Sequence, residues 1–599
     1  MLKYTALSGR LRSPLLLLSA ALLSIWCVGM LGRGYWTPDE PREADISWRM
    51  SWQADRAVPF LAGEAFCEKP PLTYWLAALP IRLFGPAAWA ARLPNLLYAM
   101  IAALGVGLLA RRSAGRIAGL AGAAAVSTFL LAYQVAIWLA TDAPLLATVC
   151  IALLGGYIGF YAAHTRERLR GYLLMHAALG LGFLCKSAVA WMVPALALVT
   201  LAVWEKRWRE LLRWELYLGL VLQAAMILTW VGFVYVGPDG AARLKVFFWN
   251  NLVGRFTHVD APDELQYAAA HRNSPGKYFI ELPLYLAPWT LLVIAALRRA
   301  WRQRKSAIDD YRPVRFALAA SLPPLAVLSM AATARNIYFA PALPGVALLL
   351  AWWTREISEA PDRWDVRALR ATSVLLLFGV MVFIAALAMA GADGWNAMSS
   401  HAEFIVISAA GLGLAASLAL SAWTAARDHV QRALWSLLLA YCALLVGPAS
   451  QVYARVDTWQ DLASIARAIE RNAVGKPLIL FAPDETTRAI IDMYARTSVE
   501  LIPGPIDAAS IERLRAAADA APQSLVVVQL RGRAGAIGQR LKEGFGPRRG
   551  SSAPQSDGPP ELPWLQSAGL RMAQVYALPN GRRYALLELN PRSVPLAGK

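Results

Sequence analysis

The chain has 599 residues, of which 57% are hydrophobic and 17% are charged, and its mean hydropathy is +0.42. A soluble protein of this length would carry more charge and fewer unbroken apolar runs, so the composition excludes that class and predicts a protein with many membrane spans. The net charge of +19 would suggest nucleic-acid binding in a soluble domain, but the basic residues lie in short loops between apolar runs, and we expect no nucleic acid as a partner.

A transmembrane helix needs about 20 mostly apolar residues, and many runs in the chain satisfy that requirement. We interpret the first run, which follows a basic start, as a span rather than as a cleaved signal peptide. The thirteen predicted spans are 13–31, 89–110, 115–133, 143–163, 170–185, 187–204, 215–237, 279–298, 314–332, 337–353, 372–391, 403–424 and 431–449.

The loops rich in Lys and Arg all fall on one side when these spans alternate across the bilayer. RRSAGR at 111–116, EKRWRELLRW at 205–214 and RDHVQR at 427–432 are three of them. Basic loops mark the cytoplasmic side. We therefore expect the N-terminus inside, and the segments 33–88 and 238–278 outside.

The segment 33–88 is unusual for a loop, because apolar and polar patches alternate along it and it contains several Trp and Tyr residues. Such a pattern is typical of short helices that lie along the membrane interface. We expect this segment to cover whatever site lies at the outer surface of the membrane.

The composition changes near residue 454. The segments 475–486 (GKPLILFAPDET) and 523–533 (QSLVVVQLRGR) are predicted to be buried strands, and 458–473 an amphipathic helix. A stretch rich in Gly, Pro and Ser at 544–563 is predicted to be a flexible insertion. We therefore divide the chain into a transmembrane domain, 1–453, and a soluble external α/β domain, 454–599.

Ionisable and aromatic side chains gather at the predicted external face. Some follow the first span in TPDEPREADISWRM, some precede two backbone-fixing prolines in CEKPPL, and others lie at the outer ends of later spans. These candidates are Asp39, Glu40, Arg42, Glu68, Lys69, Asp142, Lys186, Arg335 and Tyr338.

Acids and cations beside a bilayer suit a donor that carries a phosphate on a lipid tail. The cations would hold the phosphate and stabilise the departing charge. A carboxylate would take a proton from an acceptor hydroxyl or orient the donor. The pattern therefore predicts group transfer from a lipid-linked phosphate.

Several of these residues also have a simpler interpretation. Asp142 and Thr141 suit the caps of a helix N-terminus. Lys186 suits the end of an apolar hairpin, and Tyr338 suits the aromatic belt of a membrane protein. His176 lies in an apolar run and is interpreted as a packed histidine. The five cysteines show no paired spacing and are interpreted as small hydrophobic residues.

The order of DEPR, EKPP, TDAPL, GLGFLCKSAV and ARNIYFAPALP resembles that in the polyprenyl-phosphate-dependent membrane glycosyltransferases of the GT-C fold, over about residues 20–355. The similarity is greatest to the bacterial branch that contains the lipid A aminoarabinose transferase, a relative of the protein O-mannosyltransferases. This resemblance implies an α-helical GT-C membrane domain of about thirteen spans with a periplasmic α/β domain, in the bacterial inner membrane.

The resemblance also implies an enzyme that transfers a sugar, with inversion, from undecaprenyl phosphate to a periplasmic acceptor such as lipid A. An O-antigen, a cell-wall polymer or a secreted protein remains open as the acceptor. A transporter for a lipid-linked sugar is a further alternative, but we find no half-to-half repeat, and the ionisable residues gather at one surface rather than at the midplane. We expect the chain to act as a monomer among membrane lipids.

Roles for individual residues follow from the resemblance alone. The implied catalytic acids are Asp39, Glu40 and Asp142. The implied phosphate-binding residues are Arg42, Lys69, Arg255, Arg335, which stands where the family usually has Lys, and Tyr338. Other implied site residues are Glu68, Tyr74, Lys186, His271 and Tyr278. Glu68 and His271 would be the ligands of a divalent metal such as zinc, although zinc usually takes four ligands.

Overall fold

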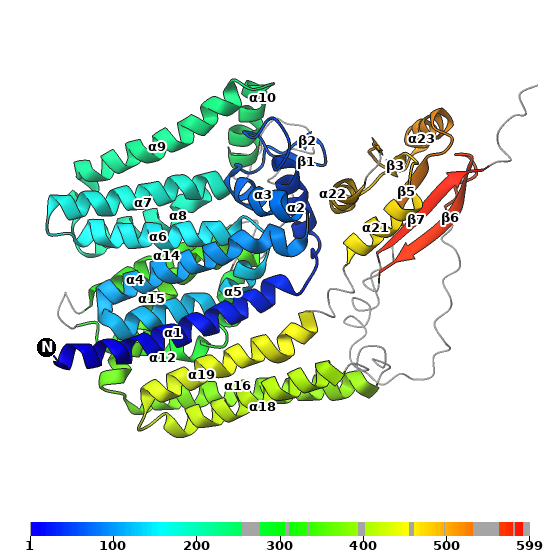
Figure 1. The fold of residues 1–599 in the computed structure, drawn as a ribbon. Helices are drawn as coiled ribbons and strands as arrows, with labels where there is room; N and C mark the ends of the chain where they lie inside the picture. Colours follow the sequence, from blue (N-terminus) through cyan, green and yellow to red (C-terminus); the bar gives the residue numbers. More distant parts are fainter. Residues whose placement is uncertain are drawn as a thin grey trace, which may run out of the picture.

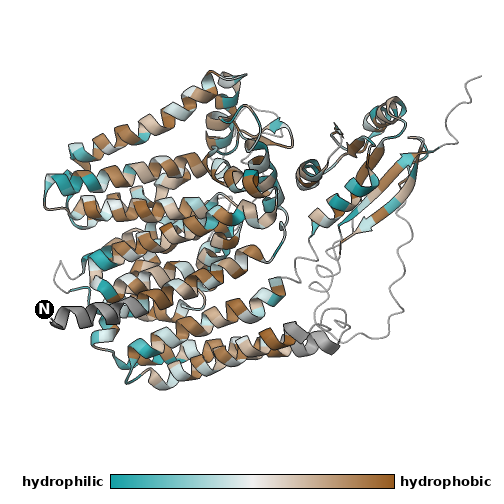
Figure 2. Cartoon of the chain, viewed as in Figure 1, coloured by the Kyte–Doolittle hydropathy of each residue, from teal (hydrophilic) through white to brown (hydrophobic). Residues whose placement is uncertain are grey.

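Long helices pack side by side in one body, and a small sheet with its own helices stands beside one end of it (Figure 1). Apolar residues predominate along most of the long helices (Figure 2), as lipid requires. The structure is a computed structural model that describes residues 2–253, 276–305, 311–331, 335–392, 402–453, 461–495, 498–530, 562–578 and 582–590.

The membrane-type helices fall into two series along the chain. The first is α1 (Leu2–Leu31), α4 (Ala88–Thr128), α5 (Leu130–Ile137), α6 (Asp142–Tyr161), α7 (Thr165–Lys186), α8 (Val189–Trp204) and α9 (Trp214–Tyr235). The second is α11 (Lys277–Tyr285), α12 (Thr290–Arg302), α13 (Arg312–Ala319), α14 (Leu322–Ser329), α15 (Leu343–Glu359), α16 (Arg363–Ala392), α18 (Ala402–Ala425) and α19 (Val430–Leu444).

Within the described residues, eight helices are long and apolar enough to cross a membrane, or nine if a bent pair counts as one span. The predicted number of thirteen is therefore not confirmed. Part of the difference lies in α4, whose backbone turns at Gly115 with φ of +90°. A Cβ on Gly119 would lie only 3.1 Å from the carbonyl oxygen of Gly107, so the helix folds back on itself there. Its two parts correspond to the predicted spans 89–110 and 115–133.

Two predicted spans are wrong as continuous helices. In place of 279–298 the chain forms α11 and α12, which meet at an angle of 110°. In place of 314–332 it forms the short helices α13 and α14. Proline is the physical reason, because Pro288 lies between the first pair and Pro323 at the start of α14, and neither can donate a helical hydrogen bond.

The segment 33–88 contains short helices, as its pattern predicts. It consists of α2 (Asp39–Met50), a small hairpin of β1 (Phe60–Leu61) and β2 (Glu64–Ala65), and α3 (Leu72–Phe84). The other segment predicted to lie outside, 238–278, begins with α10 (Gly240–Lys245) and the π-helical turn η2 (Val246–Leu252). The remaining short turns are η1 (Trp208–Leu212), η6 (Asn336–Ala342) and η7 (Leu445–Ala449).

The C-terminal part forms an α/β unit with a five-stranded sheet in the order β4-β3-β5-β7-β6. Strands β3, β4 and β5 are parallel, and β7 pairs antiparallel with both β5 and β6. The elements are α21 (Leu462–Asn472), β3 (Leu478–Phe481), α22 (Glu485–Tyr494), β4 (Val499–Ile502), α23 (Ala508–Ala520), β5 (Leu525–Leu530), β6 (Leu570–Ala577) and β7 (Arg583–Leu589).

The predicted helix and both predicted strands of this unit are present as α21, β3 and β5. The two strands are buried along nearly their whole length, which suits the centre of a sheet covered on both faces. Side chains of α21 and α22 pack on one face of the sheet, and α23 packs on the other. The predicted insertion 544–563 lies almost wholly outside the described residues.

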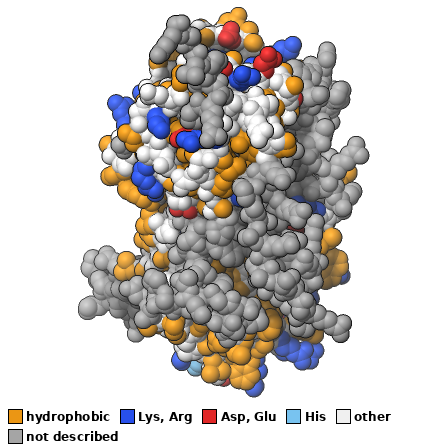
Figure 3. Space-filling model, turned by 90° about the vertical axis from the view of Figure 1, so that its right-hand side faces the viewer, with side chains coloured by type: hydrophobic (Ala, Val, Ile, Leu, Met, Phe, Trp, Pro, Cys, Tyr) orange, Lys and Arg blue, Asp and Glu red, His pale blue; other side chains and the backbone are white. Residues whose placement is uncertain are grey.

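The α/β unit packs on the segment 33–88 through α22. Arg488 pairs with Glu64 at 3.1 Å, and Arg49 pairs with Asp492. Apolar side chains of both parts, among them Tyr35 and Ile490, belong to one buried cluster. Viewed from the side of this unit (Figure 3), the described surface mixes basic, acidic and apolar side chains. The α/β unit therefore rests on the segment that carries the predicted site.

Candidate active site

Glu40 anchors α2 to the body of helices. Its carboxylate is fully buried and accepts six hydrogen bonds. Arg33 donates at 2.6 and 3.0 Å and Arg92 at 2.9 and 2.7 Å, while the backbone N–H groups of Trp36 and Leu139 donate at 2.7 and 2.9 Å. The one side chain thus joins α2 to α4, to the end of α1 and to the α5–α6 connection.

The charge of Glu40 is fixed by these neighbours. Burial opposes ionisation, but Arg92 and Arg33 together lower the pKa of this carboxyl to about 2. A catalytic acid must reach the substrate, whereas Glu40 has no exposed surface. We therefore correct the sequence-based interpretation of Glu40 as a catalytic acid to that of a supporting residue.

Asp39, one position earlier, faces Arg335 instead. Both terminal nitrogens of the Arg335 guanidinium contact the Asp39 carboxylate, one of them at 3.3 Å. The side chains remain accessible, with 17% of Asp39 and 48% of Arg335 exposed. The hydroxyl of Tyr278 donates to the Arg335 carbonyl at 2.7 Å and so supports the backbone at this point. An accessible acid and an accessible cation therefore face each other at the end of the helical body.

A second acid–cation pair lies beside the first. Asp142 is the first residue of α6 and contacts Lys186, the last residue of α7. The ammonium of Lys186 also lies 4.9 Å from the centre of the Tyr338 ring. The side chain of Thr141, at the N-cap of α6, makes no capping hydrogen bond. The Asp142 carboxylate pairs with Lys186 instead of capping the helix.

Electrostatics link these two pairs. Burial opposes the charge on Arg335, but Asp39, Tyr338 and Asp142 raise the pKa of its guanidinium. Asp39 lies on α2, Asp142 on α6 and Tyr338 on η6, so the three groups come from different parts of the fold. The structure therefore brings Asp39, Asp142, Lys186, Arg335 and Tyr338 into one cluster, as the order of motifs predicts.

A third pair involves Lys69 and an acid that the sequence analysis did not single out. The Lys69 ammonium contacts the carboxylate of Glu43. Glu43 follows Asp39 by four residues on α2, so the two acids lie on the same helix face, about 6 Å apart along the axis. Burial opposes the charge on Lys69, but Glu43 and then Glu68 raise the pKa of its amine. The i,i+4 spacing is the signal that could have revealed Glu43.

Arg42 lies close to Lys69 but is shared with the α/β unit. The guanidinium carbon of Arg42 lies 5.8 Å, and the Lys69 ammonium 5.9 Å, from the centre of the Phe66 ring. The Nε of Arg42 also contacts Glu485 of α22 at 2.9 Å. Arg42 and Lys69 thus approach the same ring, and Arg42 also pairs with an acid of the α/β unit.

A small, mainly apolar cleft borders Lys69 and lies between the segment 33–88, α9, α10 and η2. Lys69 and Arg243 are its two charged side chains, and Arg243 already pairs with Asp55 at 3.0 Å. The cleft is lined by Val58, Pro59, Phe66, Cys67, Lys69, Trp230, Val234, Arg243, Leu244 and Phe247. The volume of this cleft is about 10 Å³, which is room for one water molecule, so it marks apolar surface beside Lys69 rather than a binding channel.

Other predicted site residues take different places. Tyr74 and Tyr278 are fully buried, so they support the site rather than line it. His176 is also buried, and its Nδ1 lies 2.8 Å from the Gln223 amide oxygen, as expected of a packed histidine. Arg255 and His271 lie outside the described residues.

The predicted metal site stays a prediction. In the described part of the chain, no three His, Cys, Asp or Glu side chains lie close enough to hold a metal ion. Glu68 is half-buried there, and its predicted partner His271 is outside the described residues.

The chain is similar in sequence to known proteins. Residues 68–233 match a family model described as dolichyl-phosphate-mannose-protein mannosyltransferase. The chain is 30% identical over 489 residues to the undecaprenyl phosphate-alpha-4-amino-4-deoxy-L-arabinose arabinosyl transferase of Pectobacterium carotovorum subsp. carotovorum (strain PC1), with 78% of this chain and 82% of the relative covered.

A similar relation holds for a transferase with the same name from Pseudomonas aeruginosa (strain UCBPP-PA14). The two chains are 30% identical over 399 residues, and the match covers 64% of this chain. It spans 66% of the length of that relative, just under two thirds.

Solved structures show the same fold. ArnT from Cupriavidus metallidurans in the apo state matches with a TM-score of 0.70 and 18% identity, covering 98% of this chain and all of that one. The same protein bound to undecaprenyl phosphate matches with a TM-score of 0.69 and 18% identity, covering 97% of this chain and 99% of that one. The chain therefore has the GT-C membrane fold that the motif order implies.

Proposed function

The chain belongs to the family of undecaprenyl phosphate-alpha-4-amino-4-deoxy-L-arabinose arabinosyl transferases, and from this premise we propose that it transfers aminoarabinose from undecaprenyl phosphate to lipid A. The observation that carries the proposal is the arrangement on α2. Asp39 and Glu43, one turn apart, contact Arg335 and Lys69, and the lysine borders an apolar cleft. Cations held in this way beside apolar surface suit the phosphate of a lipid-linked donor.

In this proposal the protein spans the bacterial inner membrane, and α2 faces the periplasm. The side on which the basic loops fall supports this orientation. The α/β unit packs on α2, so it is placed on the periplasmic side as well.

The donor phosphate is bound by Lys69, with Arg42 and Arg335 nearby, and the undecaprenyl chain extends from it into the membrane. In the structure these cations are paired with Glu43, Glu485 and Asp39. The phosphate competes with these carboxylates, which keep the cations in position until it arrives.

Transfer then proceeds at the anomeric carbon of the sugar. A phosphate oxygen of lipid A attacks from the side opposite the donor phosphate, the new C–O bond forms, and the bond to the donor phosphate breaks. Its electron pair leaves with undecaprenyl phosphate, whose charge the cations stabilise. This nucleophile is already ionised and needs no base, so Asp39 orients the donor or stabilises positive charge on the ring. A hydroxyl acceptor would instead need Asp39 as its base.

The test uses purified full-length protein in detergent with undecaprenyl phosphate-aminoarabinose and lipid A. We expect release of undecaprenyl phosphate and a matching gain in the mass of lipid A. Donor that stays intact would overturn the proposal and leave transport as the better account. Donor that is consumed only with another glycan or a protein would overturn the choice of acceptor.

A further inference from the structure

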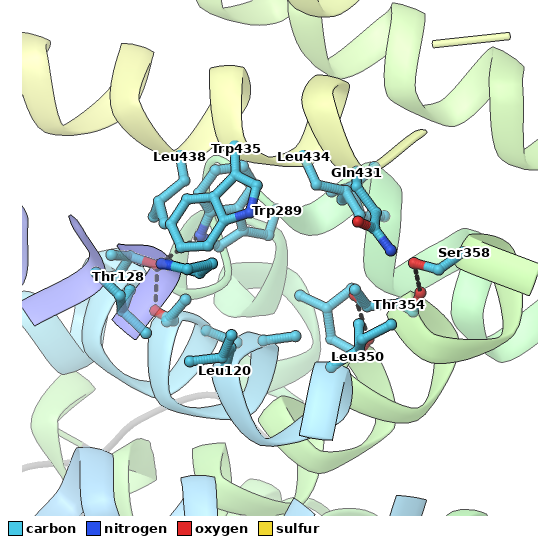
Figure 4. A pocket seen from close by; sticks show the side chains of 17 residues that line it. Leu120, Thr128, Trp289, Leu350, Thr354, Ser358, Gln431, Leu434, Trp435 and Leu438 are labelled. Carbon is cyan, nitrogen blue, oxygen red and sulfur yellow. Dashed lines mark hydrogen bonds between the residues drawn. The ribbon is translucent and has the colours of Figure 1, made fainter. Parts of the chain in front are cut away.

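A second cavity lies inside the helical body, away from the acid–cation cluster. It has a volume of about 400 Å³ and is walled by α1, α4, α12, α15 and α19. Its walls are mostly hydrocarbon (Figure 4). The main contributors are Leu120, Trp289, Leu350, Leu434, Trp435 and Leu438. This volume is within the usual range for small-molecule sites.

One end of the cavity is closed. The indole N–H of Trp289 donates to the Thr128 hydroxyl at 2.9 Å, as the dashed line in Figure 4 shows. The same indole packs edge-on against Tyr441, with ring centres 5.9 Å apart. A chain that entered from the side of the acid–cation cluster would have to break these contacts.

The opposite end is open and polar. Gln431 is exposed there, close to Thr354 and Ser358 (Figure 4). The two hydroxyls donate to carbonyls of their own helix, at 2.9 and 2.7 Å, so they are already satisfied. From Gln431 to Leu438, α19 rises about 10 Å, which is a third of the hydrocarbon thickness of a bilayer.

The open end lies at the far ends of the helices from the candidate active site. Helix α15 follows η6, which begins directly after Arg335, and reaches the cavity mouth near its other end, at Ser358. In the proposed orientation the mouth therefore opens in the cytoplasmic half of the membrane. The inference rests on that orientation but not on the transfer reaction.

The mouth is bordered by cations. Arg116 precedes the lining residue Ile117, and Arg432 follows Gln431; both arginines are exposed, and neither has an ion pair among the described residues. Basic side chains between transmembrane helices on the cytoplasmic side attract anionic lipid head groups. A hydrocarbon pocket with a basic mouth is complementary to an anionic phospholipid.

We propose that this cavity binds one acyl chain of an anionic phospholipid from the cytoplasmic leaflet. The head group lies at Gln431, near Arg116 and Arg432, and the chain ends against Trp289. The polyprenyl chain of the donor is not the occupant, because the Trp289–Thr128 contact closes the end that faces the donor site.

The test measures lipid retained by the full-length protein. Wild type and variants are reconstituted in nanodiscs of phosphatidylcholine and phosphatidylglycerol, released into mild detergent and examined by native mass spectrometry. Ala121→Phe and Leu434→Trp fill the cavity from two helices. We expect either change to reduce the occupancy of one retained phosphatidylglycerol at least five-fold. Leu16→Trp is the matched control, because Leu16 is 68% exposed and does not line the cavity.

Arg116→Gln combined with Arg432→Gln is expected to abolish the preference for phosphatidylglycerol over phosphatidylcholine while one lipid is still retained. Unchanged retention in both cavity variants would overturn the proposal. Displacement of the retained lipid by undecaprenyl phosphate would identify a polyprenyl chain as the occupant and overturn it as well. Because binding is read without turnover, failure of the transfer assay leaves this result unaffected.

Discussion

At the scale of single residues, two neighbouring acids have opposite environments. Glu40 is fully buried between Arg33 and Arg92, whereas Asp39 is partly exposed and faces Arg335. A helix turns by about 100° per residue, so adjacent side chains point in different directions. We therefore assign Glu40 to the stability of α2 and propose that Asp39 contacts the donor.

This assignment separates the effects of two conservative substitutions. Glu40→Gln leaves two buried guanidinium groups without their counter-charge, and we expect it to cost about 3–5 kcal/mol of stability. Asp39→Asn is expected to abolish transfer while the apparent Tm changes little. Thermal unfolding in detergent and the transfer assay measure the two effects. An active Asp39→Asn protein, or a Glu40→Gln protein as stable as wild type, would contradict the assignment.

Lys69 is predicted to act on the donor phosphate. A hydrogen bond to a charged group contributes about 1.5–3 kcal/mol, so Lys69→Ala is expected to lower kcat/KM for the donor about 10- to 100-fold. Lys69→Arg keeps the charge and should retain part of the activity. Steady-state kinetics with varied donor measure the change. A donor KM and kcat equal to those of wild type would remove Lys69 from the site.

At the scale of elements, α2 organises the site because Asp39 and Glu43 share one of its faces. The sequence analysis predicted that Asp39, Lys69 and the Asp142–Lys186 pair meet on one side of the membrane, since motif order and loop charge both specify that side. It did not assign Glu40 correctly, because its partners Arg33 and Arg92 approach only through tertiary folding. The helical spacing of Glu43 from Asp39 was visible, but a solvated charge would show the same spacing.

Helix continuity was also only partly predictable. Hydropathy located the apolar runs, but a window that averages over about 20 residues does not register where one proline interrupts the helix. The break at Pro288, between α11 and α12, therefore escaped the prediction. Strands β3 and β5 and helix α21 were predictable because their apolar patterns are bounded by polar turns, whereas β4, β6, β7, α22 and α23 were not predicted.

The contact between α2 and the β1–β2 hairpin is expected to depend on pH through Asp45. This carboxyl accepts from the Ala62 N–H at 2.6 Å and from Arg49 at 3.3 Å. Burial raises the pKa of Asp45 to about 6, although Arg49, the Ala62 N–H and Arg488 act in the opposite direction. The folded state therefore binds the Asp45 proton more tightly than the unfolded state does. This tighter binding stabilises the folded protein fully below about pH 4, and the contribution is lost as the pH rises through 6.

Asp45→Asn should remove that dependence, since an amide does not titrate. We expect the Tm difference between wild type and Asp45→Asn to change between pH 4 and 6.5, measured in detergent at constant ionic strength. The wild type should lose stability relative to the variant over this interval. A constant difference would show that Asp45 keeps an ordinary pKa.

At the scale of the whole molecule, an ion pair joins the α/β unit to Arg42, a residue of the proposed donor site. Glu485 is 66% exposed and contacts Arg42, which is 25% exposed. An exposed pair contributes little stability, about 0–1 kcal/mol. Glu485→Gln should therefore leave the Tm nearly unchanged while it frees Arg42 for the donor phosphate.

We expect Glu485→Gln to lower the donor KM about two- to five-fold, which corresponds to about 0.5–1 kcal/mol. Glu512→Gln is the matched control, because Glu512 is exposed on α23 and has no ion pair within the described residues. Arg42→Ala should change KM in the opposite direction. If Glu485→Gln and Glu512→Gln behave alike, the α/β unit has no influence on the donor through this pair.

The arrangement of the whole molecule also predicts which parts of the chain lie on each side of the membrane. Asp39, Lys69 and the α/β unit can share one compartment only if the basic loops lie in the other. In a variant without the five native cysteines, Ala520→Cys on α23 should react with a membrane-impermeant maleimide once the outer membrane is permeabilised. Arg209→Cys, in a basic loop, should react only after the inner membrane is opened. The reverse pattern would place the acid–cation cluster in the cytoplasm, where the proposed outward-facing transfer to lipid A could not take place.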